Sequence, residues 1–410
     1  MTDIATTCCI AGGGPAGVML GYLLARAGVG VVVLEKHADF LRDFRGDTVH
    51  PSTLGVLAEL GELQDFLARP HQKLDRMSGV VGDVTVRIAD LRHLPGPAKF
   101  VAVMPQWDFL SFLSQKAERY PDYRLKMRTE ALDLVREGER VCGVRARDPD
   151  GELTVRADLV VAADGRHSTL RARAGLEVDD LGAPMDVLWL RLPRHPGDET
   201  APLGRLVAGR MMVLIPRGDY FQCAYLIRKG GAEALRGEGL DAFKRAIADV
   251  VPLFRDRMDA LTSWDEVKLL TVTVDRLKVW FQPGLLCIGD AAHAMSPVGG
   301  VGINLAIQDA IATAGLLWRP LRERRLTEAD LKKVQRRREW PTKVTQQAQL
   351  FIQKHVIAPT LAGRQPRAGW FARLLDRAPL LQRLPARAVG LGVRPEHVRS
   401  PDAGGVRIQG

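Results

Sequence analysis

Residues 284–304, GLLCIGDAAHAMSPVGGVGIN, combine residue types and spacing that suit a ligand with a sugar at one end and an electron-rich ring at the other. An apolar run at 285–288 predicts a short strand that ends in Gly289 and Asp290, which leaves a carboxylate at the carboxyl end of the strand. A glycine-rich loop and the start of a helix follow, with candidate ligand contacts at Pro297, Gly299, Gly300, Gly302, Ile303 and Asn304. Glycines ahead of a helix let backbone N–H groups approach a ligand, with the positive end of the helix dipole behind them. For Gly289 and Asp290 taken alone, a tight strand-to-helix turn with a solvated Asp is the simpler interpretation.

The amino-terminal residues contain a second part of the predicted ligand site. A predicted strand at 5–11 leads into Gly12, Gly14 and Gly17, the G-x-G-x-x-G spacing of a βαβ nucleotide site. The first glycine allows a tight turn, the second lets the backbone approach a pyrophosphate, and the third lets the helix pack on the strand. The intervening Pro15 and Ala16 open the helix, and a second strand at 29–34 ends in Glu35 and Lys36. An acid there suits a ribose hydroxyl, so the sequence predicts FAD or NAD rather than NADP.

A third block lies at 158–171, where a predicted strand at 159–163 ends in Asp164 and Gly165. Alone, it is equally well explained as a structural turn.

Together the three blocks resemble the FAD-dependent aromatic monooxygenases of the para-hydroxybenzoate hydroxylase type, the group A flavoprotein hydroxylases. That family has an amino-terminal GxGxxG, a central DG motif, and a late GD motif that runs into PxGGxG. The resemblance covers roughly residues 1–345. It implies non-covalent FAD, with NADH or NADPH as a transient reductant because no second GxGxxG follows.

The same resemblance implies a reaction and further site residues. Reduced flavin would add molecular oxygen to give a C4a-hydroperoxide that hydroxylates an aromatic, polycyclic or quinone-like substrate. Arg45 is expected at the FAD pyrophosphate, Gln106 beside the flavin, and Pro297 and Gly299 in positioning the flavin loop. His50 is either a polar helix-start residue or a flavin-facing one.

Two alternatives stay open. One is a flavin enzyme of this fold with other chemistry, such as an isoprenoid-chain reductase or a halogenase; the W-x-W-x-I-P motif of halogenases is not found. The other is a flavin-binding, non-catalytic member, against which the intact motifs argue.

Composition agrees with a globular enzyme. The chain has 410 residues, of which 46% are hydrophobic and 26% charged, and it contains no uninterrupted apolar run of the ~20 residues that span a bilayer. Its five cysteines are scattered without metal-ligand spacing, which predicts a cytoplasmic protein without disulfides or a metal site.

The net charge of +10 is concentrated near the carboxyl end. Residues 319–410 carry 20 Lys and Arg against 7 Asp and Glu, so the rest of the chain is slightly acidic. Basic clusters at 322–325, 332–333 and 336–338 are interpreted as a solvated helix face. Contact with an anionic membrane surface is a weaker alternative, and nucleic-acid binding is weaker still.

The predicted fold is α/β. A Rossmann-type FAD-binding domain (1–75, 100–180 and 270–330) is interrupted by an antiparallel β-sheet substrate domain (76–99 and 181–269), and a helical region (331–410) follows. Strands are expected at 187–192, 210–215 and 220–227. Candidate residues for a small aromatic or hydrophobic substrate are Trp189, Arg191, Met212, Tyr220 and Gln222, with Arg210 and Tyr225 also considered. Strand alternation places Tyr220 and Gln222 on one face and Tyr225 on the other.

Overall fold

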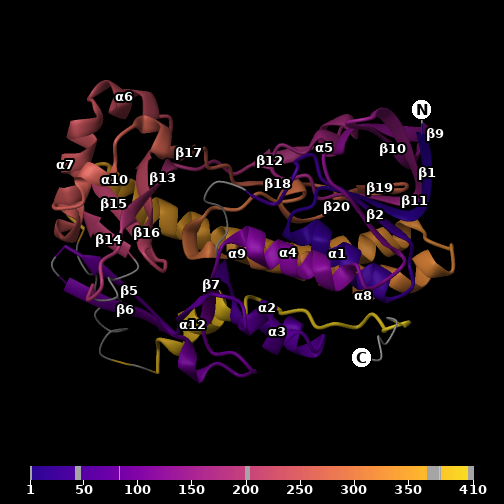
Figure 1. The fold of residues 1–410 in the computed structure, drawn as a ribbon, viewed down its shortest axis with the longest axis horizontal. Helices are drawn as coiled ribbons and strands as arrows, with labels where there is room; N and C mark the ends of the chain where they lie inside the picture. Colours follow the sequence, from indigo (N-terminus) through magenta and orange to yellow (C-terminus); the bar gives the residue numbers. More distant parts are fainter. Residues whose placement is uncertain are drawn as a thin grey trace.

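Two sheets at opposite ends of the long axis dominate the computed structural model, which describes residues 2–41, 48–82, 84–198, 204–366, 378 and 380–404. In Figure 1 a mainly parallel sheet lies at the right, near the amino terminus, and an antiparallel sheet lies at the left. A 25-residue helix, α9 (Glu328–Ile352), runs between them (Figure 1).

The mainly parallel sheet is built around β1 (Thr2–Ala11). β1 pairs in parallel with β2 (Val31–Leu34) and β11 (Gly151–Ala162), and these pairings extend outward to three shorter strands. The outer strands are β8 (Tyr123–Lys126), β20 (Leu285–Cys287) and β19 (Phe281–Gln282), and the order is β19-β20-β11-β1-β2-β8. β9 (Glu130–Glu137) and β10 (Arg140–Asp148) add an antiparallel extension to the first half of β11.

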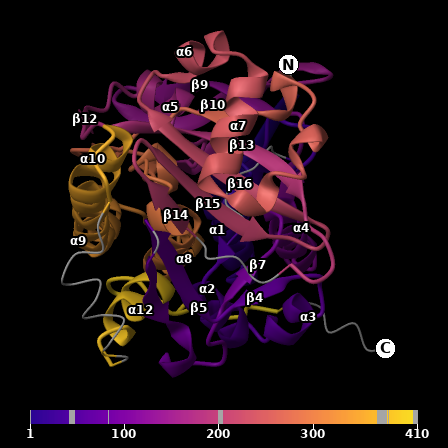
Figure 2. The ribbon, with the colours of Figure 1, turned by 90° about the vertical axis from the view of Figure 1, so that its left-hand side faces the viewer.

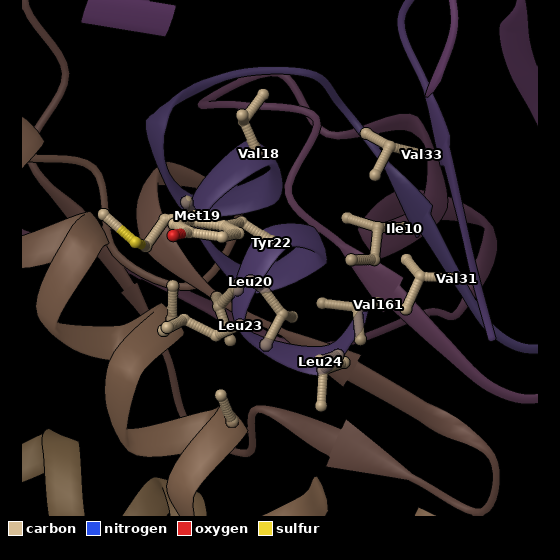
Figure 3. Close-up of a cluster of buried hydrophobic side chains, with 14 of the residues drawn as sticks. Ile10, Val18, Met19, Leu20, Tyr22, Leu23, Leu24, Val31, Val33 and Val161 are labelled. Carbon is tan, nitrogen blue, oxygen red and sulfur yellow. The ribbon is translucent and has the colours of Figure 1, made fainter. Parts of the chain in front are cut away.

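Helix α1 (Pro15–Arg26) covers one face of this sheet and is itself covered by two further helices, α4 (Gln106–Ala117) and α8 (Gly302–Arg322). Figure 3 shows leucine side chains of α1 directed at Ile10, Val31 and Val161 of the sheet. The segment Val298–Arg322 is long and apolar enough to cross a membrane by length and composition, but most of it is buried in this core. Its apolarity is therefore explained by packing.

The antiparallel sheet, in which only β14 and β5 pair in parallel among the described strands, has the order β17-β13-β16-β15-β14-β5-β6. The strands are β17 (Lys268–Leu270), β13 (Met185–Pro193), β16 (Tyr220–Arg228), β15 (Arg210–Pro216), β14 (Gly204–Val207), β5 (Arg76–Val81) and β6 (Val84–Asp90). One face packs against α7 (Leu240–Val250), with α6 (Ala232–Gly237) beside it. The expected strands at 187–192, 210–215 and 220–227 lie within β13, β15 and β16, and the predicted domain boundaries stay a prediction.

Several short elements complete the fold. They are the sheet β3-β7-β4 (Thr48–Val49, Val101–Val103, Gln72–Leu74), the pair β12-β18 (Val178–Asp180, Asp275–Leu277), and helices α2 (Pro51–Glu59), α3 (Leu63–Leu67) and α5 (Thr169–Arg173).

The carboxyl-terminal region is only partly helical. α9 continues through a π-helical turn, η7 (Gln353–Ile357), into α10 (Ala358–Leu361), which lies beside the antiparallel sheet (Figure 2), and α12 (Arg383–Gly390) packs on β6. Residues 391–404 contain no helix and form a strap across the parallel end. Proline at 395 and 401 disfavours a helix there, and the strap's backbone pairs with side chains and main chain of other segments: Arg26 donates to the Ser400 carbonyl at 2.9 Å, and the Ala403 N–H donates to the Arg26 carbonyl at 2.8 Å.

One basic cluster differs from the expectation of a solvated face. Arg338 on α9 is 1% exposed, and its guanidinium donates to Asp309 of α8 (2.9 Å) and Glu396 of the strap (3.3 Å). Arg337 donates to both oxygens of Glu396 at 2.8 and 2.9 Å. The cluster is thus partly an internal ion-pair network, because both neighbouring segments bring acids to it.

Candidate active site

The amino-terminal turn, residues 12–17, contains four glycines, and the three of the G-x-G-x-x-G spacing have different surroundings. Gly12 has φ +109°, and a Cβ there would lie 2.3 Å from the Ala163 carbonyl oxygen. A Cβ at Gly17 would lie 1.9 Å from the Gly12 oxygen, so α1 packs directly on the turn. A Cβ at Gly14 would meet no atom of the described residues within 4 Å. The first and third glycines are therefore required by the fold, whereas Gly14 faces open space.

The start of α1 is suited to an anion. Pro15 occupies the first helical turn, and Gly14, the N-cap residue, offers no side chain to cap the helix. Backbone N–H groups of the first turn then remain for a ligand, and the helix dipole favours negative charge there. Ala16 is buried behind them. A pyrophosphate fits this position.

Glu35 lies directly after β2 and is 7% exposed. Its carboxylate accepts hydrogen bonds from the Gly13 N–H (2.9 Å) and the His37 N–H (3.0 Å). The acid is therefore held against the amino-terminal turn, as a ribose-binding role requires, while the neighbouring Lys36 is exposed.

Asp164 has a local structural role. Its carboxylate accepts from the Ser168 hydroxyl (2.5 Å) and the Leu170 N–H (3.2 Å) at the start of α5. Burial raises the pKa of Asp164, and these hydrogen bonds partly oppose the shift. A contact of Asp164 with a cofactor stays a prediction.

The late GD motif meets the amino-terminal turn across the core. Gly289 has φ +60°, and a Cβ there would lie 3.2 Å from the Cβ atoms of both Ala16 on α1 and Ala306 on α8. Asp290 follows with a side chain that is 32% exposed and lies 3.6 Å from the Arg166 guanidinium. The GD motif therefore brings its backbone next to the start of α1, and Asp290 follows directly in the chain.

Residues 297–302, here called the glycine loop, lead into α8. Gly299 and Gly300 both have positive φ, +81° and +63°. The Thr48 hydroxyl donates to the Gly300 carbonyl at 3.2 Å, and a Cβ at Gly300 would lie 2.9 Å from that hydroxyl oxygen. No side chain of the described residues caps α8, which begins at Gly302, so this is a second helix start with N–H groups available to a ligand.

Asn304 ties the start of α8 to the segment before α2. Its amide oxygen accepts from the His50 N–H (3.0 Å) and the Thr53 hydroxyl (2.8 Å), and its amide nitrogen donates to the Thr48 carbonyl (3.3 Å). The side chain is thus engaged by the protein. Ile303 is partly buried in the main core.

His50 is a helix-start residue, as one of its two interpretations predicted, and its position facing the flavin stays a prediction. It is the N-cap residue of α2, and it is 1% exposed next to the glycine loop. Its Nδ1 lies 2.7 Å from the Val389 carbonyl, so Nδ1 carries the proton and donates, and Nε2 is 3.7 Å from where a Cβ of Gly300 would be. Burial lowers the pKa of His50 to about 4, although the bond to Val389 opposes the shift. The ring is therefore neutral near pH 7.

A buried ionic cluster lies behind the GD motif. Asp309 of α8 is fully buried and accepts from the Gly289 N–H (3.0 Å), His293 Nε2 (2.5 Å) and Arg338 Nε (2.9 Å). Burial by itself raises the pKa of Asp309, but His293 and Arg338 outweigh it and hold the pKa below its usual range. No motif in the sequence predicted this cluster, although an acid inside an otherwise apolar helix was a usable signal.

Two glutamine side chains of α9 donate hydrogen bonds to backbone carbonyls of the segment before α8 and of β18. The Gln346 amide donates to the Asp275 carbonyl (2.7 Å) and the Ala294 carbonyl (3.2 Å). The Gln349 amide donates to the carbonyls of Ser296 and Val298, both at 2.9 Å. Pro297 therefore lies between two clamped carbonyls.

The antiparallel sheet presents its inner face, the one opposite α7, to the glycine loop. Val298 packs against a cluster on this face that includes Val187, Ala224 and Leu226. Strand pairing places Trp189, Arg191, Tyr220 and Gln222 on the inner face as well. The Gln222 amide oxygen accepts from the buried Arg217 guanidinium at 3.0 and 3.2 Å, and the Arg191 guanidinium lies 4.9 Å from the centre of the Tyr220 ring.

Three other candidates lie on the face covered by α7. Met212 is fully buried there, Tyr225 packs edge-on against Phe243, and Arg210 pairs with Asp249 at 2.9 Å. These three side chains are therefore directed away from the glycine loop. The predicted separation of Tyr225 from Tyr220 and Gln222 agrees with the observed register. Met212 differs because its face is set by strand pairing with residues distant in sequence.

The contacts expected of Arg45 with the pyrophosphate and of Gln106 with the flavin both stay predictions. Arg45 lies outside the described residues. Gln106 is the first residue of α4, partly buried, and Pro105 precedes it as the N-cap.

Comparisons with known proteins agree with this geometry. A family model described as an FAD binding domain matches residues 5–348. A 6-methylpretetramide 4-monooxygenase of Streptomyces rimosus is 33% identical over 399 residues, which cover 96% of this chain and 94% of that protein. A 3-demethoxyubiquinol 3-hydroxylase of Escherichia coli is 26% identical over 77% of this chain and 81% of its own length. Among solved structures, the OxyS anhydrotetracycline hydroxylase of Streptomyces rimosus shares the fold with a TM-score of 0.74 and 21% identity, covering 95% of this chain and 77% of that one.

Proposed function

This chain belongs to the FAD-binding-domain family of flavin-dependent monooxygenases, and from that premise we propose that it hydroxylates a polycyclic aromatic compound. It uses FAD, with NADH or NADPH as reductant and molecular oxygen as co-substrate. The observation that carries the proposal is the contact between the glycine loop and the inner face of the antiparallel sheet, through Val298. A ring bound at the loop and a substrate bound on the sheet would then be neighbours.

The residues present fit the dinucleotide part of FAD. Open space at Gly14, the uncapped start of α1 and the acid at Glu35 suit a pyrophosphate followed by an adenosine ribose. We assign Glu35 to the ribose hydroxyls, residues 12–17 and Arg45 to the pyrophosphate, and Asp290 to the ribityl chain. Gln106 is assigned to a position beside the ring.

At the ring end, bound FAD supplies the activation of molecular oxygen. The protein contributes position and electrostatics. The free N–H groups at the start of α8 favour negative charge at this end of the site, and their fixed orientation avoids reorganisation during reaction. His50, neutral and anchored to Val389, keeps an uncharged nitrogen beside the loop.

The substrate class rests on the surface that would receive it and on the relatives. The inner face is apolar around Val187, Ala224 and Leu226, with Trp189 at its edge, which suits a flat aromatic molecule. The relative from Streptomyces rimosus is named for its action on 6-methylpretetramide. We therefore place the substrate among oxygenated, fused-ring aromatics.

The location proposed is the cytoplasm, with small molecules as the only partners. All five cysteines are free, which suits a reducing compartment.

The proposal is tested by turnover with isotopic labelling. The FAD-loaded protein is screened with oxygenated naphthalenes, anthracenes and tetracyclic phenols for stimulated oxidation of NADH and NADPH, under air enriched in ¹⁸O₂. A true substrate should raise the rate of cofactor oxidation and yield a product that carries one labelled oxygen atom. Anaerobic turnover, or product oxygen derived from water, would refute hydroxylation and favour the flavin reductase alternative.

A further inference from the structure

Helix α9 carries a row of three buried glutamines. Gln346, Gln349 and Gln353 are 0%, 4% and 1% exposed. Their spacing of three and four residues puts them on one face of the helix. Glutamine is rarely buried without hydrogen-bond partners, so each side chain has to be accounted for.

In the first two glutamines, the amide nitrogen has a structural role. Gln346 and Gln349 use their amide nitrogens to clamp the backbone on either side of residue 295, as described above. The Gln346 oxygen also accepts from Arg276 at 2.8 Å. The Gln349 oxygen, in contrast, is buried and has no hydrogen-bond partner among the described residues.

The third glutamine has no such role. Neither the amide nitrogen nor the amide oxygen of Gln353 has a hydrogen-bond partner in the part of the chain that the structure describes, although both are buried. Gln353 is also the residue at which the α-helix changes to the π-helical turn η7. Such turns are uncommon and occur frequently at functional sites.

Gln353 lies on the helix between two residues that pack on the inner face of the antiparallel sheet. Its neighbours along the helix face, Leu350 and Ile357, both pack into the apolar cluster of that face. Trp189 and Val298 border the same cluster, and the indole N–H of Trp189 is likewise buried without a partner among the described residues. Gln353 and Trp189 thus both carry buried hydrogen-bonding atoms without a partner among the described residues, next to one apolar surface.

We propose that Gln353, together with the indole N–H of Trp189, is the polar anchor that orients an oxygenated ring of the substrate against the glycine loop. The amide both donates and accepts, and the indole donates, so the pair recognises a hydroxyl beside a second oxygen. Both groups are neutral, which favours an uncharged phenol or quinone over a carboxylate. This inference rests on the proposed function. It adds that, among fused-ring aromatics, the enzyme selects those with a hydroxyl beside a second oxygen.

A buried amide without a hydrogen bond destabilises the folded protein, so its presence at this position is explained by a partner that arrives with the substrate. Replacing Gln353 by methionine, which is similar in shape and apolar, removes that cost. The variant should therefore keep or gain thermal stability and lose substrate recognition.

The test measures binding and melting in FAD-loaded Gln353→Met, Trp189→Phe and wild-type protein. Binding of 2,3-dihydroxynaphthalene, whose two hydroxyls are adjacent, and of naphthalene is followed by the change in flavin absorbance. The Kd for dihydroxynaphthalene should rise roughly three- to tenfold in each variant, as loss of one neutral hydrogen bond predicts, and the Kd for naphthalene should stay the same. Lys354→Met, a change at the exposed next residue, should alter neither constant.

The outcomes separate this inference from the proposed function. A lower melting temperature of Gln353→Met would make Gln353 a structural residue and overturn the inference without the need for any ligand. Equal binding of dihydroxynaphthalene by wild-type and Gln353→Met protein, or no preference of the wild type for it over naphthalene, would overturn the inference alone. Failure of every fused-ring compound to bind or to stimulate turnover of the wild type would refute the proposed function as well.

Discussion

A substitution at Gly14 should separate cofactor binding from folding. The backbone at Gly14 has φ −76° and ψ −176°, which alanine adopts without strain, and a Cβ there meets nothing within 4 Å among the described residues. Gly14→Ala should therefore leave the free energy of unfolding of the apoprotein unchanged, or raise it by about 0.4–1 kcal/mol through the unfolded state. The methyl group would, however, occupy the space that we assign to the pyrophosphate.

The size of the effect on FAD follows from the contacts that would be lost. A pyrophosphate oxygen displaced by a methyl group loses at least one charge-assisted hydrogen bond, worth about 1.5–3 kcal/mol, so the Kd for FAD should rise about ten- to a hundredfold. Quenching of flavin fluorescence on titration of apoprotein measures this constant, and urea unfolding of the same apoprotein measures stability.

Gly17→Ala is the matched control for this experiment. Its Cβ would lie 1.9 Å from the Gly12 oxygen, so the turn itself must shift. This variant should lose stability by about 1–3 kcal/mol as well as FAD affinity. A Gly14→Ala protein that binds FAD within about threefold of the wild-type Kd would refute the assignment of the pyrophosphate to this turn.

Three further predictions follow from the site. Glu35→Ala should weaken FAD binding about ten- to a hundredfold in the same titration, through loss of a charge-assisted contact of roughly 1.5–3 kcal/mol, and unchanged retention would make Glu35 a turn-stabilising acid only. Gly300→Val should abolish substrate-stimulated NAD(P)H oxidation, because its φ of +63° and a Cβ 2.9 Å from the Thr48 hydroxyl both oppose a branched side chain; normal flavin spectra and turnover would contradict this. The pKa of His50 is lowered to about 4, so the folded protein does not bind a proton that the unfolded chain takes up below about pH 6.5. The free energy of unfolding should therefore fall by up to about 3 kcal/mol between pH 6.5 and 4. Urea unfolding of His50→Gln should show a smaller loss over that window.

Much of the cofactor end of the site could be predicted from sequence because its constraints are local. Gly12, Gly14 and Gly17 are fixed by one turn and one helix start, and Glu35 by the end of the next strand. The inner and outer faces of β16 followed from alternation alone, which is why Tyr220 and Tyr225 were separated correctly.

The parts that were not predicted depend on partners far away in sequence. Arg338 belongs to a basic run that periodicity reads as solvated, and only packing of α9 on α8 brings it to Asp309. The face taken by Met212 depends on pairing between β14, β15 and β16. Gln353 carries no motif, and its burial is evident only once its helix neighbours Leu350 and Ile357 pack on the sheet.

The helix is continuous from α9 to α10. The orientation of the glycine loop relative to the antiparallel sheet therefore depends on the number of residues in this helix. Gln346 and Gln349 fix its middle to the backbone before α8, and the carbonyls of Thr360 and Leu361 accept from Gly209 and Arg228 at its far end. One residue added between these two attachments would turn one end by about 100° relative to the other and lengthen the rod by about 1.5 Å. The π-helical turn at Gln353 absorbs such an extra residue by widening the helix, so both ends keep their partners. A graft of a different antiparallel sheet onto this scaffold would therefore have to preserve the residue count between Gln349 and Thr360, including that turn.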